Sequence, residues 1–455
     1  MTSKNSSDAI AYYKSHYDDL FNQFQTLLRI PSISTADESK QDVQKAADFL
    51  VKKLKSIGLK NVKAYATPRH PLIYADYLAD PDKPTILIYG HYDVQPPDPL
   101  DEWKTPPFEP TIRDEYLFAR GASDMKGQVW ANISALESIL KTSDLPVNIK
   151  ILFEGEEEIG SPSLDPFLEE HKNLLKCDLV LNTDADMLAP DKPTIIYALR
   201  GLAYFELRVY GPDADLHSGI FGGVVDNPAN VLAKLIAGMH DENGTITLPG
   251  FYDKVRKISA QESDDLSQIG MDDEFFKKIT GVSALGGEKD FPPVERIGAR
   301  PTLDVNGLYA GYIEPGAKTI IPAYALAKIS TRLVPDQDPK DVEKSLVAYL
   351  KSHVPDTVRW ELEYMSGAPA YITDEAPGVD LFMKALEETW QVTPIKKREG
   401  GSIPVATSMK NILGVDSILT GFGLPDDQIH SPNERLHLPT HKKGVQALIR
   451  FYLSF

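Results

Sequence analysis

The N-terminal part of the chain carries apolar residues at the spacing of amphipathic helices. They recur every three or four positions over Asp8–Leu28 and Asp42–Ile57, which predicts helices that each turn one face to a core. Another helix is predicted over Lys126–Leu140. Short apolar runs predict strands at Leu72–Leu78, Thr85–Tyr89, Val147–Phe153 and Leu179–Asn182, with a proline-rich loop over Gln95–Pro110. Strands that alternate with helices favour a largely parallel sheet covered on both faces.

The pattern changes near Leu199 and returns to its first form after Gly367. Between these points, Asn227 and Pro228 supply an N-cap and a first-turn proline for a helix to Met239. The segment also contains predicted strands at Ala203–Tyr210, Thr302–Val305, Ala323–Leu333 and Val358–Tyr364, a helix at Pro339–Leu350 and a less regular stretch at Asp241–Arg300. The order β-α-β-β-α-β is typical of a two-layer α+β module.

The chain is therefore predicted to be an α/β protein in which a second domain interrupts the first. The main domain, with its mostly parallel sheet, is expected over residues 1–198 and 367–455, and the inserted α+β domain over residues 199–366. A length of 455 residues suffices for two or three domains, each with its own core.

Composition narrows the classes of partner. The chain has 48 Lys and Arg against 66 Asp and Glu, a net charge of −18, which disfavours binding to nucleic acid or anionic membranes. Cys177 is the only cysteine, so we expect neither an intrachain disulfide nor a cysteine-rich metal site. The first residues lack the apolar stretch of a signal peptide. No apolar run reaches about 18 residues, the length of a membrane span. These features predict a cytoplasmic protein.

The run from Glu154 to Glu158 is the most unusual local feature. The predicted strand that ends at Phe153 is followed by four acids within five residues, Glu154 and Glu156–Glu158. Runs of glutamate are ordinarily solvated surface. Here, however, carboxylates at the end of a buried strand would repel one another and resist desolvation. A bound cation would explain the run, so a metal-centred hydrolase is the first hypothesis.

Other histidines and acids also follow predicted strands. His91 comes just after Thr85–Tyr89, at the strand end where open parallel sheets place their sites, and Asp93 is spaced to hold its second ring nitrogen. Asp184 and Asp186 compete for the position after Leu179–Asn182, and His430 follows a later apolar stretch.

Asp124 stands on a glycine-flanked loop before a predicted helix. It is either that helix's N-cap or a further ligand. Histidine and carboxylate ligands without cysteine suit Zn²⁺, Mn²⁺ or Co²⁺. Two histidines and three acids are enough for two metal ions about 3.5 Å apart with one bridging carboxylate.

Over nearly its whole length the sequence resembles the M20 metallopeptidases, and most closely their cytosolic non-specific dipeptidase and carnosinase-like branch. The segments that carry the resemblance are Gly90–Gln95, Gly121–Gly127, Glu154–Ser161, Leu199–Leu202, Asp215–Gly219, Ser330–Pro335, Arg398–Pro404 and His430–Glu434. Their order along the chain is that of the family.

The resemblance implies a metal site with five ligands. His91 and Asp184 would bind one metal ion, and Glu158 and His430 the other. Asp124 would bridge the two ions. Both are expected to be divalent cations, with Zn²⁺ as the first choice and Mn²⁺ or Co²⁺ as alternatives.

The resemblance also assigns the catalytic base, within a run of three glutamates. Aligning the family motif on Gly160 and Ser161 makes Glu157 the base and Glu158 the ligand, although a slip by one residue would bring in Glu156. Asp93 would orient His91.

Substrate contacts are implied for the inserted domain and the turn that follows it. His217 would stabilise the oxyanion in the neighbouring subunit's site, which implies a homodimer formed through a lid and dimerisation domain. Arg332 would bind the substrate α-carboxylate, with the backbone of Gly401 and Ser402, and Thr319 would also contact substrate.

The expected activity is hydrolysis of the peptide bond of dipeptides by a water that two metal ions activate, with a small peptide as the only substrate partner. A departure bears on the side-chain preference: residues 368–380 lack a histidine that carnosinase-like relatives often carry. The alternatives are an M20-type amidohydrolase that acts on N-acyl amino acids or as a carboxypeptidase, and a catalytically silent binding homologue.

Overall fold

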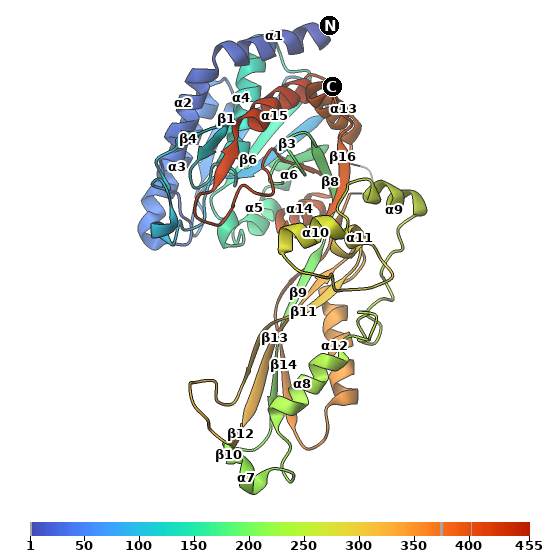
Figure 1. Ribbon diagram of the computed structural model, residues 1–455. Coiled ribbons are helices and arrows are strands. Elements are labelled where there is room, and N and C mark those ends of the chain that lie inside the picture. Colours follow the sequence, from blue (N-terminus) through green and yellow to red (C-terminus); the bar gives the residue numbers. More distant parts are fainter. Residues whose placement is uncertain (1, 374–375, 402) are drawn as a thin grey trace. The chain divides into compact units, whose positions relative to one another are not determined.

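The computed structural model describes residues 2–373, 376–401 and 403–455 (Figure 1). The chain forms two compact units. The first unit consists of Met1–Tyr197, Thr373–Lys396 and Pro404–Phe455, and the second of Ala198–Ile372 and Lys397–Ile403. The sequence-based prediction that residues 199–366 are a separate domain, able to fold independently, remains a prediction.

The N-terminal helices belong to the first unit. The helical pattern over Asp8–Leu28 forms two helices rather than one, α1 (Thr2–Ser15) and α2 (Tyr17–Leu28), because the backbone leaves the helical region at His16. Helix α3 (Lys40–Ser56) follows. Each of α2 and α3 buries one apolar face in the large core of this unit.

The central sheet of the first unit has the strand order β1-β2-β6-β3-β7-β17-β8. The middle strands β6, β3, β7 and β17 are parallel, and antiparallel strands flank them on both sides. The strands are β1 (Lys60–Tyr65), β2 (Leu72–Tyr77), β3 (Thr85–His91), β6 (Asn148–Glu154), β7 (Leu179–Asn182), β17 (Ser417–Thr420) and β8 (Thr194–Leu199). The short strands β15 (Tyr371–Ile372) and β16 (Ile395–Glu399) pair with β8.

Helices cover this sheet on both faces (Figure 1). One face carries α1 to α3 with α4 (Lys126–Leu140), α13 (Val379–Trp390) and α15 (Leu438–Tyr452), and the other carries α5 (Leu164–Glu170), α6 (Lys172–Leu175) and α14 (Pro404–Ser408). Every residue of β6 is buried, and so is nearly all of α4. The predicted α/β fold with a buried parallel sheet is confirmed for these central strands.

A small three-stranded sheet joins distant parts of the first unit. Its order is β18-β5-β4, with β18 (Arg435–His437), β5 (Tyr116–Phe118) and β4 (Thr111–Arg113). Arg435 pairs with Phe118, so the loop before β18 lies beside the loop after β5.

The second unit has the predicted element order β-α-β-β-α-β. Its antiparallel sheet, β11-β13-β9-β14, packs against two helices. These elements are β9 (Gly201–Tyr210), α8 (Pro228–Gly238), β11 (Thr302–Ala310), β13 (Tyr324–Leu333), α12 (Pro339–His353) and β14 (Arg359–Ala368). Alternate residues of β13 are buried, as expected for a sheet with one covered face. The two-layer α+β prediction is confirmed, and Asn227 caps α8 as expected, since its side chain accepts from the Ala229 N–H at 2.9 Å.

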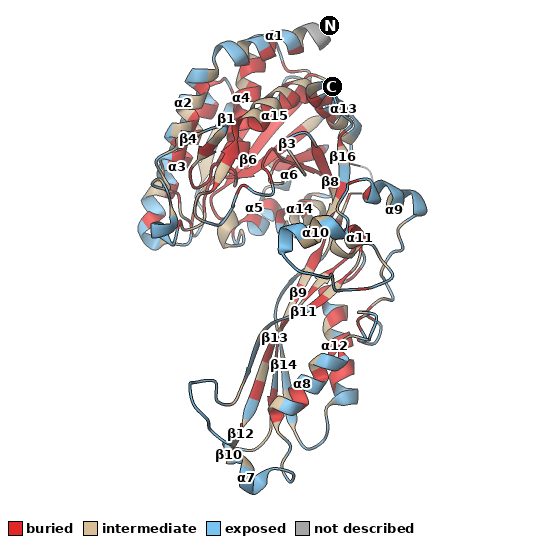
Figure 2. Cartoon of the chain, in the orientation of Figure 1, coloured by how far each residue is buried: buried red, intermediate tan, exposed pale blue. Residues whose placement is uncertain are grey.

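The stretch predicted to be irregular contains short helices, α9 (Ala260–Ser267), α10 (Asp273–Thr280) and α11 (Pro293–Gly298). Elsewhere in this unit β10 (Leu216–His217) pairs with β12 (Ile320–Ile321) and leads into α7 (Ser218–Phe221). Figure 2 shows the central strands of the first unit, such as β3 and β6, as buried and α7 as mostly exposed. Across the described residues, no helix has the length and apolar character that a membrane crossing requires.

Candidate metal centre

Three neighbouring parallel strands bring acidic and histidine side chains to one edge of the sheet. His91 is the last residue of β3, Glu158 lies in the turn after β6, and Asp184 follows β7 by two residues. Because β6, β3 and β7 are adjacent and parallel, their carboxyl ends meet at the same edge. Asp124, which precedes α4, and His430, in the loop before β18, reach the same place.

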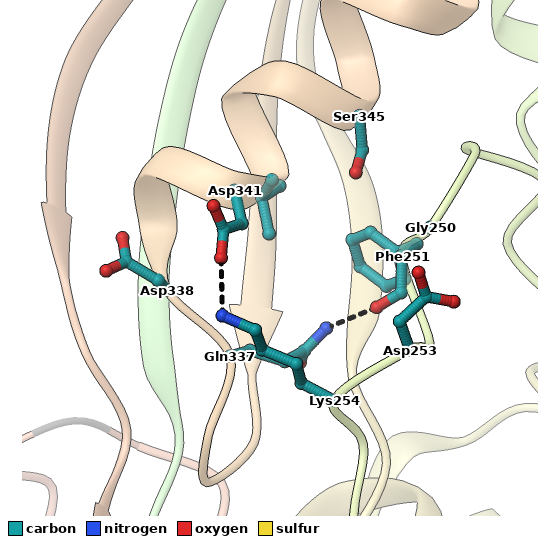
Figure 3. Close-up of a pocket in the computed structure, with 9 residues that line it drawn as sticks. Gly250, Phe251, Asp253, Lys254, Gln337, Asp338, Asp341 and Ser345 are labelled. Carbon is teal, nitrogen blue, oxygen red and sulfur yellow. Dashed lines mark hydrogen bonds and ion pairs between the residues drawn. The ribbon is translucent and has the colours of Figure 1, made fainter.

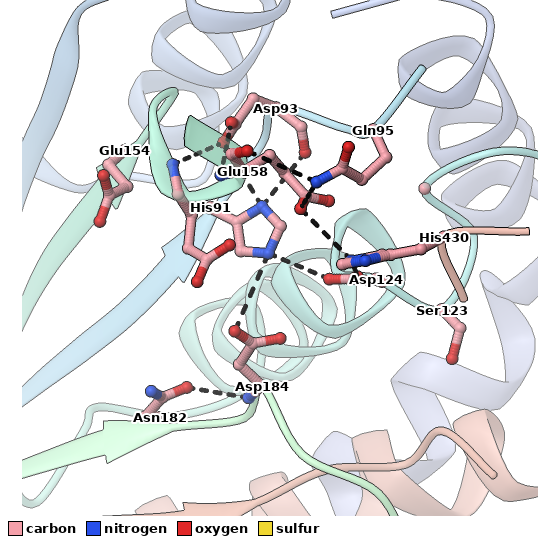
Figure 4. Close-up of polar contacts among 12 residues, drawn as sticks. His91, Asp93, Gln95, Ser123, Asp124, Glu154, Glu158, Asn182, Asp184 and His430 are labelled. Carbon is pink, nitrogen blue, oxygen red and sulfur yellow. Dashed lines mark hydrogen bonds and ion pairs between the residues drawn. The ribbon is translucent and has the colours of Figure 1, made fainter. Parts of the chain in front are cut away.

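Asp124 lies between the two histidines (Figure 4). Its Oδ1 is 3.1 Å from His91 Nε2, and its Oδ2 is 2.9 Å from His430 Nε2. Asp184 Oδ2 is 3.8 Å from His91 Nε2. Glu158 Oε2 is 3.3 Å from His430 Nε2. Each carboxylate oxygen of Asp124 therefore faces a different histidine and a different second acid.

These side chains form two groups that share Asp124. In His91–Asp124–Asp184 and in Asp124–Glu158–His430, one ligand atom from each residue lies within 4.8 Å of the others. The donors are imidazole nitrogens and carboxylate oxygens only, the set that suits Zn²⁺, Mn²⁺ or Co²⁺. The geometry fits two divalent ions with one bridging carboxylate.

The electrostatics of this cluster also favour bound cations. Hydrogen bonds that His430 donates to the carboxylates of Asp124 and Glu158 raise its pKa to about 10. Burial raises the pKa of Asp184 well above its usual range. In the described part of the chain, no lysine or arginine forms an ion pair with the three carboxylates of the cluster. The cluster therefore attracts positive charge that only the histidines supply from within the protein.

Asp93 supports both sides of the cluster. Its backbone carbonyl lies 3.1 Å from His91 Nδ1 and its carboxylate 3.4 Å from the same atom, which directs Nε2 toward Asp124. The Asp93 carboxylate also accepts from the backbone N–H groups of Glu157 and Glu158, at 3.3 and 3.0 Å. It thus orients a histidine and holds the turn that carries a second ligand.

Glu157 has the electrostatic surroundings of a general base. Burial raises its pKa to about 7, the attraction of His91 opposes this shift, and the negative charges of Glu158 and Asp124 add to it. A carboxylate with a pKa near 7 exchanges protons readily at neutral pH.

The other two acids of the run have structural roles that were missed from the sequence. Glu156 is buried, and its carboxylate accepts from Thr67 Oγ1 at 2.7 Å and from the backbone N–H and hydroxyl of Ser163 at 3.1 and 3.0 Å. Glu154 accepts from Tyr89 Oη at 2.6 Å, and burial raises its pKa to about 8. The oxygens of Glu156 are therefore occupied by donors from its own surroundings.

Two alternatives left open by the sequence are decided by the structure. Asp124 is not the N-cap of α4, because that position belongs to Met125 and lacks a side-chain capping bond. Asp184, not Asp186, lies in the ligand groups. The backbone of Asp186 forms an isolated parallel β-bridge with Gly423. A glutamine was also missed: Gln95 Nε2 donates to Glu158 Oε2 at 2.8 Å, and no sequence pattern marks it.

The residues predicted to contact substrate belong to the second unit. His217 is exposed, and its Nδ1 accepts from the Gly219 N–H at 3.0 Å. Thr319 is also exposed, and its carbonyl accepts from the Ser218 N–H at 3.1 Å. Both residues lie on the small β10–β12 ribbon or beside it.

The second unit also carries a pair of arginines. Arg332 is half-buried on β13, and burial together with the like charge of Arg332 lowers the pKa of Arg200 to about 10. Arg200 Nε donates to the Gly400 carbonyl at 3.0 Å, beside the exposed Gly401. The predicted contact at Ser402 lies outside the described residues.

A pocket elsewhere in the second unit has no comparable chemistry (Figure 3). It is lined by small and apolar residues together with Asp253, Lys254, Gln337, Asp338 and Asp341. Lys254 pairs with Asp341 at 2.7 Å, and Gln337 Nε2 donates to the Phe251 carbonyl at 2.8 Å. Lys254 and Asp341 are therefore already paired with each other.

Comparison with known proteins agrees with this geometry. The chain is 34% identical over 94% of its length to the Cys-Gly metallodipeptidase DUG1 of Candida albicans, of which it covers 92%. It is 33% identical over 85% of its length to the beta-Ala-His dipeptidase of Mus musculus, of which it covers 80%. It also resembles the solved structure of an M20 family metallo-carboxypeptidase from Sulfolobus solfataricus, with a TM-score of 0.81, 32% identity and coverage of 95% of this chain and 98% of that one.

The family model described as peptidase family M20/M25/M40 matches residues 87–454. That range includes the five clustered ligands and the whole second unit. The chain belongs to the M20 family of metallopeptidases.

Proposed function

We propose that this protein is a metallodipeptidase that hydrolyses the peptide bond of dipeptides at a site for two divalent cations. The observation that carries the proposal is the position of Asp124, whose two oxygens face different histidines at 3.1 and 2.9 Å. His91 and Asp184 would hold one ion, and Glu158 and His430 the other, with Zn²⁺ as the first choice and Mn²⁺ or Co²⁺ as alternatives.

Two such cations supply a water of lowered pKa and a Lewis acid for the scissile carbonyl. The protein supplies the proton transfers. Glu157, a largely buried carboxylate in the turn that carries the ligand Glu158, takes a proton from the attacking water and delivers it to the leaving amine. Asp93 keeps His91 and the turn at Glu157 in place during both transfers.

The second unit is proposed to bind the substrate's carboxylate. Arg332 offers a guanidinium that pairs with a carboxylate through two hydrogen bonds, and the neighbouring Arg200 adds positive charge. The backbone at Gly401 and Ser402 and the side chain of Thr319 complete the proposed contacts. A dipeptide presents a free carboxylate on the residue that follows its scissile bond, so a guanidinium that binds a carboxylate suits such a substrate.

His217 is proposed to donate to the oxyanion in the site of a second copy of the chain, so the active form would be a homodimer. Its exposure supports this role, as do the exposed apolar residues that follow it, Ile220 at 68% and Val224 at 85%. A cytoplasmic location, inferred from the single cysteine and acidic charge, completes the proposal.

Another activity competes with the dipeptidase proposal. The likeness to a carboxypeptidase at 32% identity favours cleavage of a C-terminal residue from longer chains. The same site chemistry would also hydrolyse N-acyl amino acids, since these share the carboxylate and the amide bond. A catalytically silent homologue is disfavoured because the ligand groups are complete and Glu157 is in place.

Turnover of a small substrate panel by protein reconstituted with Zn²⁺, Mn²⁺ or Co²⁺ separates these activities. The panel contains Cys-Gly, carnosine, a tripeptide and N-acetyl amino acids. Cleavage of the dipeptides well above the others is expected. Cleavage confined to acyl amino acids, or equal cleavage of the tripeptide, would overturn the dipeptidase proposal, and metal-loaded protein without any turnover would support the silent homologue.

A further inference from the structure

A buried carboxylate outside the ligand groups joins the loops that carry Asp124 and His430. Glu434 has no exposed surface and lies four residues after His430. Its Oε1 accepts from the backbone N–H groups of Ser123 at 2.9 Å and Asp124 at 3.1 Å, and its Oε2 from the Gly121 N–H at 2.9 Å and Arg120 Nη1 at 2.8 Å. One carboxylate therefore binds almost the whole segment that leads to Asp124.

The strand register puts Glu434 in this position. It immediately precedes β18, whose Arg435 pairs with Phe118 of β5. The Ala119 N–H donates to the Glu434 carbonyl at 3.1 Å. The residues that follow Ala119 therefore lie beside the Glu434 side chain. A second contact ties the same loops, because Ser123 Oγ donates to Asp427 Oδ2 at 2.7 Å.

The hydrogen bonds to Glu434 restrict the backbone of the segment from Arg120 to Asp124. Backbone N–H groups that point at a carboxylate form charge-assisted hydrogen bonds, which are stronger than neutral ones. Each donor would otherwise be buried without a partner, which is unfavourable. Movement of Asp124 away from its observed position would therefore break several of these bonds at once.

We propose that Glu434 is a positioning residue that sets the bridging orientation of Asp124 and thereby couples the two metal sites. The inference rests on the proposed two-metal function. A terminal ligand such as His91 or Glu158 serves one ion, whereas Asp124 serves both. Any change that turns its carboxylate is therefore expected to weaken the two sites together.

The substitution Glu434→Gln tests this with little change in volume. An amide offers an acceptor on one side only, so its NH₂ group must face two N–H donors in either orientation. The segment then has to shift or lose bonds.

Asp76→Asn is the matched control. Asp76 is another buried carboxylate of the first unit, and it accepts from Asn61 Nδ2 at 2.9 Å and Tyr74 Oη at 3.0 Å. In the strand register, Asp76 of β2 lies opposite Lys150 of β6. That position is away from the end of β6 at Glu154, which leads to the metal ligands. Its loss is expected to affect the fold without affecting the ligands.

The full-length protein, freed of metal by a chelator, is titrated with Co²⁺ and followed by calorimetry and visible absorption. Wild type and Asp76→Asn should bind two equivalents with the same affinities. Glu434→Gln should bind both equivalents about 10- to 100-fold more weakly, the usual effect of losing a group that orients a ligand. Folded Glu434→Gln that binds both equivalents like wild type would overturn the inference, as would a loss confined to one of them.

The wild-type arm separates the two proposals. Fewer than two equivalents in wild type would contradict the proposed function itself. Two equivalents in wild type, bound by Glu434→Gln with the same affinities, would contradict only the role of Glu434. If circular dichroism shows that Glu434→Gln is unfolded, Glu434→Asp replaces it. That carboxylate is one methylene too short to reach all four donors, so the same joint weakening is expected, and wild-type affinity would overturn the inference.

Discussion

The two units hold their proposed functional residues in different ways. In the first unit, His91 and Asp93 are fully buried, and each of the clustered ligands has at least one further side chain of the cluster as a partner. In the second unit, His217 and Thr319 lie exposed on a short two-stranded ribbon. The ligands of the first unit are held by one another, even though the His430 side chain is 52% exposed. His217 and Thr319 instead lie where a group from outside their own unit can reach them.

The comparison has a consequence for mutation. A ligand held by buried contacts cannot be changed without affecting the structure around it. An exposed residue such as His217 makes few contacts within its own unit, so its loss should affect activity alone. Each of the variants below tests one side of this contrast.

The largest effect is expected for Glu157→Gln. Turnover should fall by about 10²- to 10⁴-fold, the usual contribution of a positioned general base, because an amide cannot accept the proton from water. The two metal equivalents should remain, since Glu157 is not one of the clustered ligands. Steady-state kinetics and metal analysis of the same sample measure both.

The control for this prediction is Glu156→Gln. Its carboxylate is bonded to Thr67 and Ser163, so the variant should lose stability while its turnover falls far less than that of Glu157→Gln. The opposite ranking would assign the base to Glu156 and shift the motif by one residue.

The strand ends could be predicted from the sequence because apolar runs give way abruptly to His91, Glu154 or Asp184. The parallel alternation then implied that these ends meet. What orients the ligands could not be predicted. Glu434 meets Asp124 across 310 positions of the chain, and Gln95 is an ordinary loop residue in sequence. The different roles of Glu154, Glu156 and Glu157 also depend on hydrogen-bond donors from other loops, such as Thr67.

The next largest effect is expected in the second unit. His217→Ala should lower turnover by about 10²- to 10³-fold, the usual cost of losing an oxyanion donor. Metal content and melting temperature should not change, because the side chain is exposed and its one described bond is to Gly219.

Mixing His217→Ala with Glu157→Gln tests whether His217 acts in the other subunit. A mixed dimer would combine an intact Glu157 in one subunit with an intact His217 from its partner, so mixing should restore activity well above either variant alone. No recovery, under conditions where subunits exchange, would place His217 in its own chain's site or remove it from the mechanism.

A smaller effect is expected from pH on the core of the first unit. His441, on α15, is buried, its Nε2 donates to the Gly127 carbonyl at 2.9 Å, and burial lowers its pKa to about 4. The unfolded chain, with an ordinary histidine pKa of about 6.5, binds this proton first. Between these values the unfolded state holds more protons, so acidification should cost up to about 3 kcal/mol of stability through this residue alone.

His441→Gln keeps a donor for Gly127 and removes the titration. In metal-free samples, the urea midpoint of wild type should therefore fall more steeply than that of the variant as the pH is lowered from about 7 to about 4.5. Parallel slopes would show that His441 is not buried as a neutral imidazole.

The smallest effect is expected for Asn227→Ala, which removes the N-cap of α8 in the second unit. The cost should be about 1 kcal/mol, because the Ala229 N–H loses its partner. Hydrogen exchange should show faster opening of α8, with Co²⁺ binding in the first unit unchanged. A change in metal affinity would contradict the independence of the two sets of residues.

The central claim is that Asp124 bridges two metal ions. Anomalous diffraction from crystals of the zinc-loaded protein, recorded on both sides of the zinc edge, tests it most directly. We predict two peaks about 3.5 Å apart, one among His91, Asp124 and Asp184 and the other among Asp124, Glu158 and His430. A single peak, or two peaks of which only one contacts Asp124, would contradict the account.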